Sequence, residues 1–159
     1  MTRRSHTEFI VLHCSATKPH LNIGRDVIRE WHLAKGWADI GYHAVVKRNG
    51  LIEFGRPFDD IGAHVAGYNG TTVGVCLVGG LYADGSEAED DFDGLYTVEQ
   101  KHALRELLVV LKAAYPDAQI VGHRDLSPDK DGDGKIEKHE WLKSCPGFAA
   151  REWAKRAGL

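Results

Sequence analysis

The sequence has few cysteines, no long hydrophobic run and no excess of basic residues. Three cysteines among 159 residues are too few, and odd in number, for a disulfide framework, which favours a reducing compartment. Because 20 Lys and Arg residues are balanced by 23 Asp and Glu residues, giving a net charge of −3, we expect no nucleic-acid partner. The longest apolar runs, such as Val73–Val78, are too short to cross a bilayer, so no membrane partner is expected.

A secretory signal is also missing from the first residues. The basic residues Arg3 and Arg4 are followed only by the short apolar run Phe9–Leu12, which is shorter than the apolar region of a signal peptide. We therefore expect the protein to remain in the cytoplasm of the cell that makes it until lysis, or a pore made by another protein, releases it. We also expect a monomer.

The sequence does contain the composition and the apolar patterns of a globular domain. Hydrophobic residues make up 43% and charged residues 27%, and the length suits a single domain covering residues 1–159. Runs of β-branched and apolar residues predict strands at 7–13, 72–78 and 119–123. Asn49-Gly50 joins the segments 42–48 and 51–56, and this pair predicts a hairpin with a type I′ turn.

Helices are predicted where apolar residues recur at helical spacing. They cover residues 25–34, capped by Asn22, residues 97–114, opened by a capping box, and residues 148–156. In the first helix we expect Ile28 and Trp31 to lie on the buried face, whereas residues 83–94 are expected to form a surface loop. The loose alternation of strands and helices predicts an α/β fold with a central mixed β-sheet flanked by α-helices.

Three side chains could bind a metal ion. His13 and His123 each stand at the C-terminal end of a predicted strand, and Cys145 lies in a Lys-Ser-Cys-Pro segment. Two imidazoles and a thiolate are good zinc ligands, and three protein ligands leave one tetrahedral position open for water. The spacing alone does not decide this, because the histidines could instead cap strands and the cysteine could be a small buried hydrophobe.

Several segments, in order along nearly the whole chain, resemble the type 2 N-acetylmuramoyl-L-alanine amidases, which include amidase-type phage lysozymes and peptidoglycan-recognition proteins. The matching segments are residues 13–17 (HCSAT), 41–43 (GYH), 62–64 (GAH), 68–69 (YN), 73–80 (VGVCLVGG), 122–125 (GHRD) and 143–148 (KSCPGF). The resemblance implies zinc held by His13, His123 and Cys145. It also implies peptidoglycan as the partner, with cleavage of the amide between N-acetylmuramic acid and the L-alanine of the stem peptide.

The same resemblance implies roles for four further residues. Tyr42 occupies the place of the catalytic tyrosine and Lys143 that of the catalytic lysine, where its cation could stabilise the developing oxyanion. Tyr42 could position water or relay a proton; the alternatives are a buried strand residue for Tyr42 and a solvated loop residue for Lys143. His64 and Asn69 are expected to contact substrate, although a structural hydrogen bond of His64 is an open alternative. We expect His43 to point away from Tyr42 and into the core.

Two other functions remain open at this stage. Family members that keep the fold but lose a zinc ligand recognise peptidoglycan without cutting it, so a non-catalytic binding module is one alternative. Some phage lysozymes of this type also bind and inhibit a phage RNA polymerase, which makes that enzyme a possible second partner. All three ligand types are present together with Tyr42 and Lys143, which favours the enzyme, and a phage endolysin that lyses the host cell is the form of it that the resemblance implies.

An insertion at residues 129–140 departs from the resemblance and matches the EF-hand calcium loop. The residues that fit the calcium-binding positions are Asp129, Asp131, Asp133, Lys135 through its carbonyl, and Glu140. Gly134 stands where the loop turns sharply, and Ser127-Pro128 excludes an ordinary preceding helix. The insertion predicts Ca²⁺ binding that would order the segment carrying Lys143 and Cys145; a solvated acidic loop is the alternative.

Overall fold

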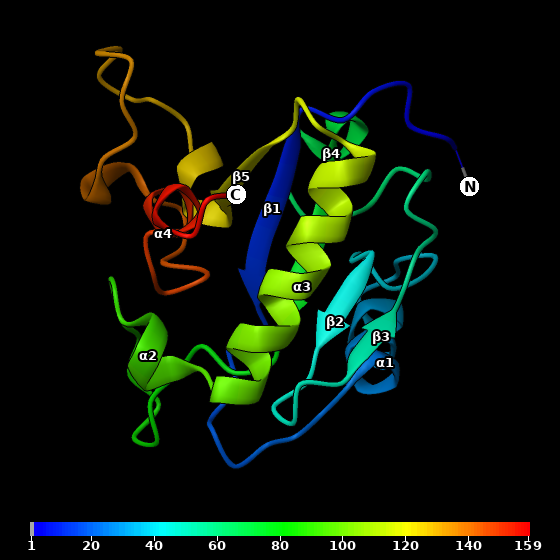
Figure 1. Ribbon diagram of the computed structural model, residues 1–159, viewed down its shortest axis with the longest axis vertical. Helices are drawn as coiled ribbons and strands as arrows, with labels where there is room; N and C mark the ends of the chain where they lie inside the picture. Colours follow the sequence, from blue (N-terminus) through cyan, green and yellow to red (C-terminus); the bar gives the residue numbers. More distant parts are fainter. Residues whose placement is uncertain (1) are drawn as a thin grey trace.

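The computed structural model describes residues 2–159, which fold around one five-stranded sheet (Figure 1). The sheet has the order β3-β2-β4-β1-β5, formed by β1 (Phe9–Cys14), β2 (Ala44–Val46), β3 (Ile52–Phe54), β4 (Thr72–Leu77) and β5 (Gln119–Gly122). The pairs β2–β4, β4–β1 and β1–β5 are parallel, and only the edge strand β3 runs antiparallel to its neighbour. The predicted mixed sheet is therefore confirmed.

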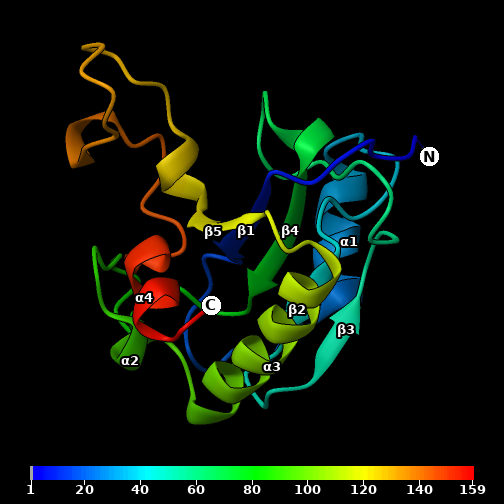
Figure 2. The ribbon, with the colours of Figure 1, turned by 45° about the horizontal axis from the view of Figure 1, so that its top comes forward.

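Helices cover both faces of this sheet (Figures 1 and 2). The long helix α3 (Val98–Ala114) lies on one face, and α1 (Arg25–Ala34) lies on the other. Because strand side chains alternate, Ile10 and Leu12 of β1 pack in the core on the α3 side, whereas Val11 belongs to a separate cluster. His13 lies two residues after Val11, so it is on the same face as Val11 and points away from the α3 core.

The remaining helices are short. They are α2 (Phe92–Leu95), α4 (Ala150–Arg156) and the 3₁₀ helices η1 (Asn69–Thr71), η2 (His123–Leu126) and η3 (Lys138–Glu140). Helix α2 corrects the prediction of an unbroken loop at 83–94, since Asp91 accepts a hydrogen bond from the Gly94 backbone N–H and starts a helical turn. Within residues 2–159, no helix combines the length and the apolar character that a membrane crossing needs.

Two local predictions at helix α1 are wrong. The helix begins after Gly24, and the Arg25 backbone N–H is satisfied from afar by Glu53 Oε2 (2.6 Å). The predicted cap, Asn22, instead accepts a hydrogen bond from the Arg48 backbone N–H (3.1 Å). Trp31 is 42% exposed rather than buried, because Ile28 and His32 fill the face that packs on the sheet.

The β2–β3 hairpin forms as predicted, but its turn is of another type. A type I′ turn needs positive φ at both central residues. Gly50 has φ +81°, whereas Asn49 is not among the described residues with positive φ. The turn is closed by the Gly50 N–H on the Lys47 carbonyl (2.9 Å). In α3 the predicted capping box is present, with Gln100 N–H donating to Thr97 Oγ1 (3.1 Å).

Candidate metal centre

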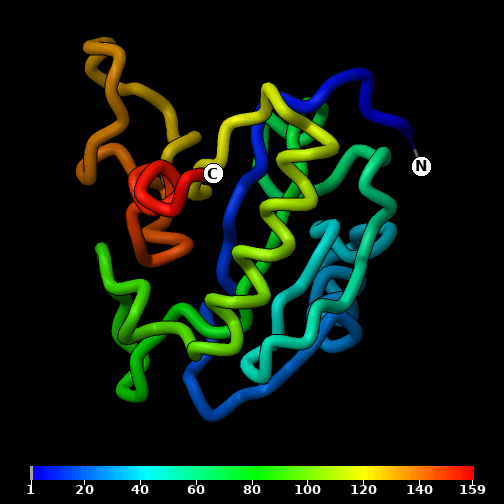
Figure 3. Tube along the Cα trace, viewed as in Figure 1, coloured from blue at the N-terminus to red at the C-terminus, as the bar shows by residue number. Residues whose placement is uncertain are grey.

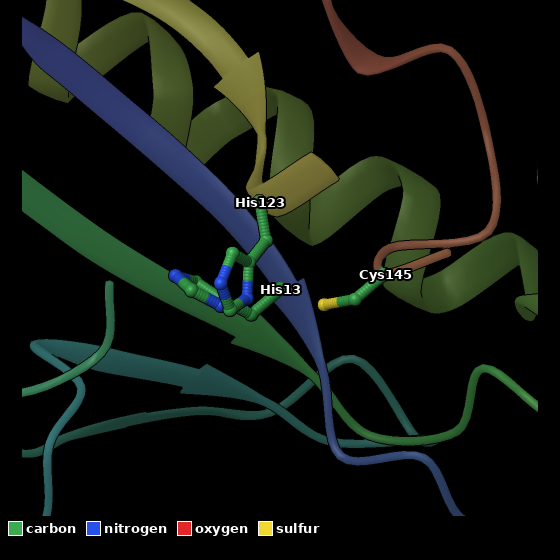
Figure 4. A group of neighbouring side chains, drawn as sticks. All are labelled: His13, His123 and Cys145. Atoms are coloured by element: carbon green, nitrogen blue, oxygen red, sulfur yellow. The ribbon is translucent and has the colours of Figure 1, made fainter. Parts of the chain in front are cut away.

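His13, His123 and Cys145 come together at one edge of the sheet. Strands β1 and β5 are parallel neighbours, and Leu12 of β1 lies opposite Gly122 of β5. The next residue on each strand is a histidine, so His13 and His123 lie side by side. The two imidazole rings are 4.7 Å apart between centroids. Cys145, from the segment before α4, brings its sulfur to the same point, and one ligand atom from each residue lies within 4.8 Å of the others (Figure 4).

The protonation states of the two imidazoles suit metal binding. Burial, together with the neighbouring His64, holds the pKa of His13 well below its ordinary value. Burial and the nearby Lys143 cation lower the pKa of His123 to about 4. Both rings are therefore neutral near pH 7, and each keeps a nitrogen lone pair for a metal ion.

The sulfur of Cys145 is held in place by the backbone of β1. The Cys14 N–H donates a hydrogen bond to Cys145 Sγ at 3.1 Å. A hydrogen bond with the Cys14 side chain, and burial, raise the pKa of the Cys145 thiol in the absence of an ion. A divalent cation reverses this preference, because it binds the thiolate directly. Two neutral imidazoles and one thiolate thus fit Zn²⁺ by donor chemistry and by mutual distance.

A cavity of about 440 Å³ opens beside these ligands. Lys143 and Tyr42 both line it, as the sequence prediction of two catalytic residues requires. The Tyr42 ring centroid is 5.0 Å from that of His13. Burial, with the neighbouring cysteines, raises the pKa of Tyr42 well above its ordinary value, so the phenol keeps its proton at neutral pH and can donate a hydrogen bond.

Three residues in or just after helix α1, none of them predicted to be functional, also line the cavity. Trp31 and Lys35 stand one helical turn apart, and Trp37 follows just after the helix. Their exposed indoles, 42% for Trp31 and 39% for Trp37, offer flat apolar surfaces next to the metal ligands. The i, i+4 spacing of Trp31 and Lys35 is a signal that could have placed both on one exposed face.

His43 is buried, as expected of a core histidine, and its ring stacks on Phe58, which packs against the core on the α3 side. Its Nδ1 accepts from the Gly74 N–H and its Nε2 donates to the Asp60 carbonyl, both at 2.9 Å. Its ring lies 5.7 Å from His64, and that of Tyr42 lies 6.3 Å from His64. Tyr42 packs instead against the cluster of Ile28 and Ile40, so the two side chains contact different clusters.

His64 and Asn69 make contacts within the protein. His64 lines the cavity, but its two ring nitrogens lie within hydrogen-bond distance of His13 Nε2 (2.9 Å) and Thr72 Oγ1 (3.2 Å). Asn69 Oδ1 accepts from the backbone N–H groups of His64 and Val65 at 2.8 and 2.9 Å. Their predicted contact with substrate stays a prediction.

The segment 129–140 forms a loop that projects away from the sheet (Figures 2 and 3). One ligand oxygen each from Asp129, Asp131 and Glu140 lies within 4.8 Å of the other two. Asp129 accepts from the N–H groups of Gly132 (2.6 Å) and Gly134 (2.9 Å). The Asp133 side chain is not part of this close group, and the Lys135 carbonyl as a ligand stays a prediction.

Comparison with known proteins places the chain among cell-wall amidases. A family model described as N-acetylmuramoyl-L-alanine amidase matches residues 3–148. The endolysin of Klebsiella phage KP32 is 42% identical over 152 residues, which cover 96% of this chain and 88% of that protein. The endolysin of Escherichia phage T7 is 40% identical over 151 residues, covering 95% and 87%.

Solved structures show the same fold. The Ph2119 endolysin from a Thermus scotoductus bacteriophage superposes with a TM-score of 0.71 at 25% identity, over 99% of this chain and 88% of that one. Wild-type Drosophila PGRP-LB superposes with a TM-score of 0.68 at 22% identity, over 98% and 83%.

Proposed function

The chain belongs to the N-acetylmuramoyl-L-alanine amidase family and is an amidase of that class, and we propose that it degrades peptidoglycan with the help of Zn²⁺ bound by His13, His123 and Cys145. The bond cleaved is the amide between N-acetylmuramic acid and the L-alanine of the stem peptide. The observation that carries this proposal is the convergence of the three ligand atoms within 4.8 Å at the edge of the cavity. When bound, Zn²⁺ supplies a Lewis acid for the amide carbonyl and lowers the pKa of a water molecule in its open position.

Lys143 and Tyr42 are the side chains that would assist the metal ion in this reaction. Lys143 is exposed in the cavity and close enough to lower the pKa of both His13 and His123 by its charge. The same charge would stabilise the oxyanion that develops on the amide oxygen during attack. Tyr42, which keeps its proton, would donate a hydrogen bond that orients water or substrate; its raised pKa argues against a role as general base.

We further propose that this activity is that of a phage endolysin, which stays in the host cytoplasm until release and then lyses the cell by cutting its wall. The two phage proteins named endolysin, each similar over most of its length, support this role. The presence of all three ligand types favours an enzyme over a peptidoglycan-binding module. Binding of a phage RNA polymerase stays a prediction.

As a second metal site, we propose that loop 129–140 binds Ca²⁺. The match to the EF-hand pattern and the close approach of Asp129, Asp131 and Glu140 support it. Bound calcium would order the chain that leads to Lys143 and Cys145. Calorimetric titration of Ca²⁺ into chelator-treated protein should show one site; the absence of binding at millimolar Ca²⁺, with unchanged activity, would remove this proposal.

The amidase proposal is tested on purified peptidoglycan with mass spectrometry of the products. Wild type should release stem peptides with a free L-alanine amino terminus, stop after chelation, and recover with Zn²⁺ but not with Mg²⁺. Metal analysis should find one zinc per chain, and none in His13→Ala. The exposed His102 on α3 provides a matched control, since His102→Ala should retain both zinc and activity. New reducing sugar ends, instead of free amino termini, would refute the proposed bond specificity.

A further inference from the structure

A chain of hydrogen bonds runs from the proposed zinc ligand His13 into the protein interior. His13 Nε2 lies 2.9 Å from His64 Nδ1, and His64 Nε2 lies 3.2 Å from Thr72 Oγ1. The Thr72 hydroxyl in turn donates to the Tyr68 backbone carbonyl at 3.0 Å. The linking side chains are buried, with 1% of His13, 7% of His64 and none of Thr72 exposed, so water does not compete for these bonds.

The carbonyl at the end of the chain gives the hydrogen bonds a direction. A carbonyl oxygen can only accept, so the single hydroxyl proton of Thr72 points to Tyr68, and Thr72 Oγ1 accepts from His64 Nε2–H. A neutral imidazole carries one proton, so His64 Nδ1 is then an acceptor, and His13 Nε2 must be the donor. His13 Nδ1 is left with its lone pair, and no hydrogen bond between described residues occupies it.

A histidine binds a metal ion as a neutral imidazole, with one proton on the ring. One proton lies between His13 Nε2 and His64 Nδ1, and the direction set at Thr72 places it on His13. The directed hydrogen bonds therefore select a single pair of tautomers. The metal-binding nitrogen of His13 is thus fixed by residues that lie outside the cluster of ligands.

The position of the His64 ring is built into the backbone around it. A Cβ atom at Gly74 would lie 2.6 Å from His64 Cγ, and one at Gly62 would lie 2.5 Å from His64 Cδ2, so larger residues would displace the ring. Asn69 Oδ1 accepts a hydrogen bond from the His64 backbone N–H and thereby fixes the backbone at His64. The ring therefore packs closely against Gly62 and Gly74, and its backbone is held by Asn69.

We propose that His64 is a positioning residue that holds His13 in the Nε2–H tautomer, with Thr72 and the Tyr68 carbonyl setting the direction of the hydrogen bonds. The inference rests on the proposed zinc site and names a determinant of its metal affinity. It differs from the predicted substrate contact of His64, because His64 here acts through His13 and needs no substrate.

The tautomers can be read without any metal. Long-range ¹H–¹⁵N NMR spectra of the chelator-treated protein at pH 7 should show His13 and His64 both protonated at Nε2. In Thr72→Val, which keeps the shape but removes the hydroxyl, the His64 ring should lose this single assignment. Protonation of wild-type His13 at Nδ1 would overturn the proposal directly.

Zinc affinity, measured by competition with a chromophoric chelator, supplies the second readout. Loss of an outer hydrogen-bond partner typically lowers metal affinity by about 10- to 100-fold. We expect His64→Leu and Thr72→Val to fall in that range, while Thr72→Ser, which keeps the hydroxyl, stays within about twofold of wild type. His64→Asn, which retains an acceptor atom near the place of Nδ1, should recover part of the loss.

The outcomes separate this inference from the proposed function. A wild type that binds no zinc would overturn the metal centre, and this inference with it. If Thr72→Val and His64→Leu bind zinc as tightly as wild type does, the inference is overturned but the metal centre is not. Metal-free melting temperatures of the variants identify any that do not fold, and Thr72→Ser against Thr72→Val then decides the case.

Discussion

The zinc candidate and loop 129–140 are two sites that oppose each other in almost every physical respect. His13, His123 and Cys145 come from separate elements, are largely buried and offer soft nitrogen and sulfur donors. The loop gathers the hard carboxylate oxygens of Asp129, Asp131 and Glu140 within one short segment. The first site is assembled by the fold, and the second by its own backbone.

This difference determines what keeps each site ready for an ion. At the sheet edge, burial keeps the imidazoles neutral, and neighbouring groups such as the Cys14 N–H and His64 orient the donors. In the loop, backbone N–H groups bind the carboxylates in the absence of an ion, for example Lys130 N–H on Glu140 Oε1 (2.5 Å). The centre thus depends on the folding of the whole sheet, whereas the loop depends on contacts close in sequence.

Replacing Lys143 has the largest expected effect. Lys143 follows the loop in sequence but lines the cavity beside the zinc candidate, where its proposed role is to stabilise the oxyanion. Replacing Lys143 by Met keeps the aliphatic stem and removes the charge. Loss of one oxyanion-stabilising group typically costs about 10²–10³ in kcat, so we expect a reduction of that order. Initial rates on peptidoglycan measure it, beside the zinc content.

Zinc content should stay at one per chain in Lys143→Met, since the proposed role of the side chain is to stabilise charge and not to bind the ion. The exposed Lys155 of α4 is the matched control, and Lys155→Met should keep full activity. Equal activity of Lys143→Met and wild type would assign Lys143 to the solvated loop and remove it from the site.

Acidification should affect the sheet region around His43 at a higher pH than it affects the loop. Burial lowers the pKa of His43 to about 4, against an ordinary value of about 6.5. The unfolded chain therefore takes up a proton first, so the stability is complete above about pH 6.5 and falls towards pH 4, by up to roughly 3 kcal/mol for this group. Urea unfolding of metal-free protein across this range measures the loss.

The loop should keep its structure between pH 6.5 and 4. Hydrogen bonds from Gly134 and Gly132 N–H lower the pKa of Asp129, and those from Glu137 and Lys130 N–H lower that of Glu140. Their contribution is present above about pH 4 and lost only as the pH falls below it. NMR amide shifts of Gly132 and Gly134 that change between pH 6.5 and 4 would contradict this separation. So would a His43→Asn variant whose unfolding free energy falls with pH as steeply as that of wild type.

Glu140→Gln sharpens the comparison at the loop. It removes one charge from the calcium candidate while keeping the size of the side chain, and we expect Ca²⁺ affinity to fall by at least about tenfold. Zinc affinity in calcium-free buffer should remain within about twofold of wild type. Calorimetry with each ion, on one protein preparation, measures both; a matching loss of zinc affinity would show that the two sites are not independent.

The sequence predicted these two regions by different kinds of signal. The loop could be predicted because its ligand positions fall within one contiguous pattern, from Asp129 to Glu140. For His13, His123 and Cys145 the residue types and strand ends suggested ligands, but convergence depended on the register of β1 with β5, which a linear pattern does not contain. The resemblance to a known family supplied what local spacing could not.

Errors arose where distant contacts replaced local ones. The cap of α1 comes from Glu53 on β3, so Asn22, the nearest residue with a capping side chain, was the wrong choice. Trp31 fits the apolar stripe of α1 but lines the cavity, because the sheet accommodates only Ile28 and His32. The link between His13, His64 and Thr72 joins three segments and leaves no signal in the sequence.

Trp141 gives the smallest expected effect and tests whether the two regions communicate. The Arg124 guanidinium lies 4.0 Å from the centre of the Trp141 ring. Arg124 follows the zinc candidate His123, and Trp141 follows the calcium candidate Glu140, so this stack joins residues adjacent to the two sites. A cation–π pair whose aromatic partner is partly exposed, as Trp141 is, contributes about 0.5–1 kcal/mol. Any rise in zinc affinity caused by Ca²⁺ should therefore be modest, up to about fivefold.

Trp141→Leu keeps an apolar side chain but removes the aromatic face, and it should abolish this calcium-dependent rise while leaving zinc affinity in calcium-free buffer within about twofold. Because coupling between binding sites is reciprocal, Zn²⁺ should raise Ca²⁺ affinity by the same factor in wild type and not in the variant. Leu142→Ala, at the neighbouring residue with 65% of its surface exposed, is the control that should keep the coupling. Equal coupling in Trp141→Leu and wild type would mean that the ordered backbone from Glu140 to Cys145, rather than the stacked pair, connects the loop to the centre.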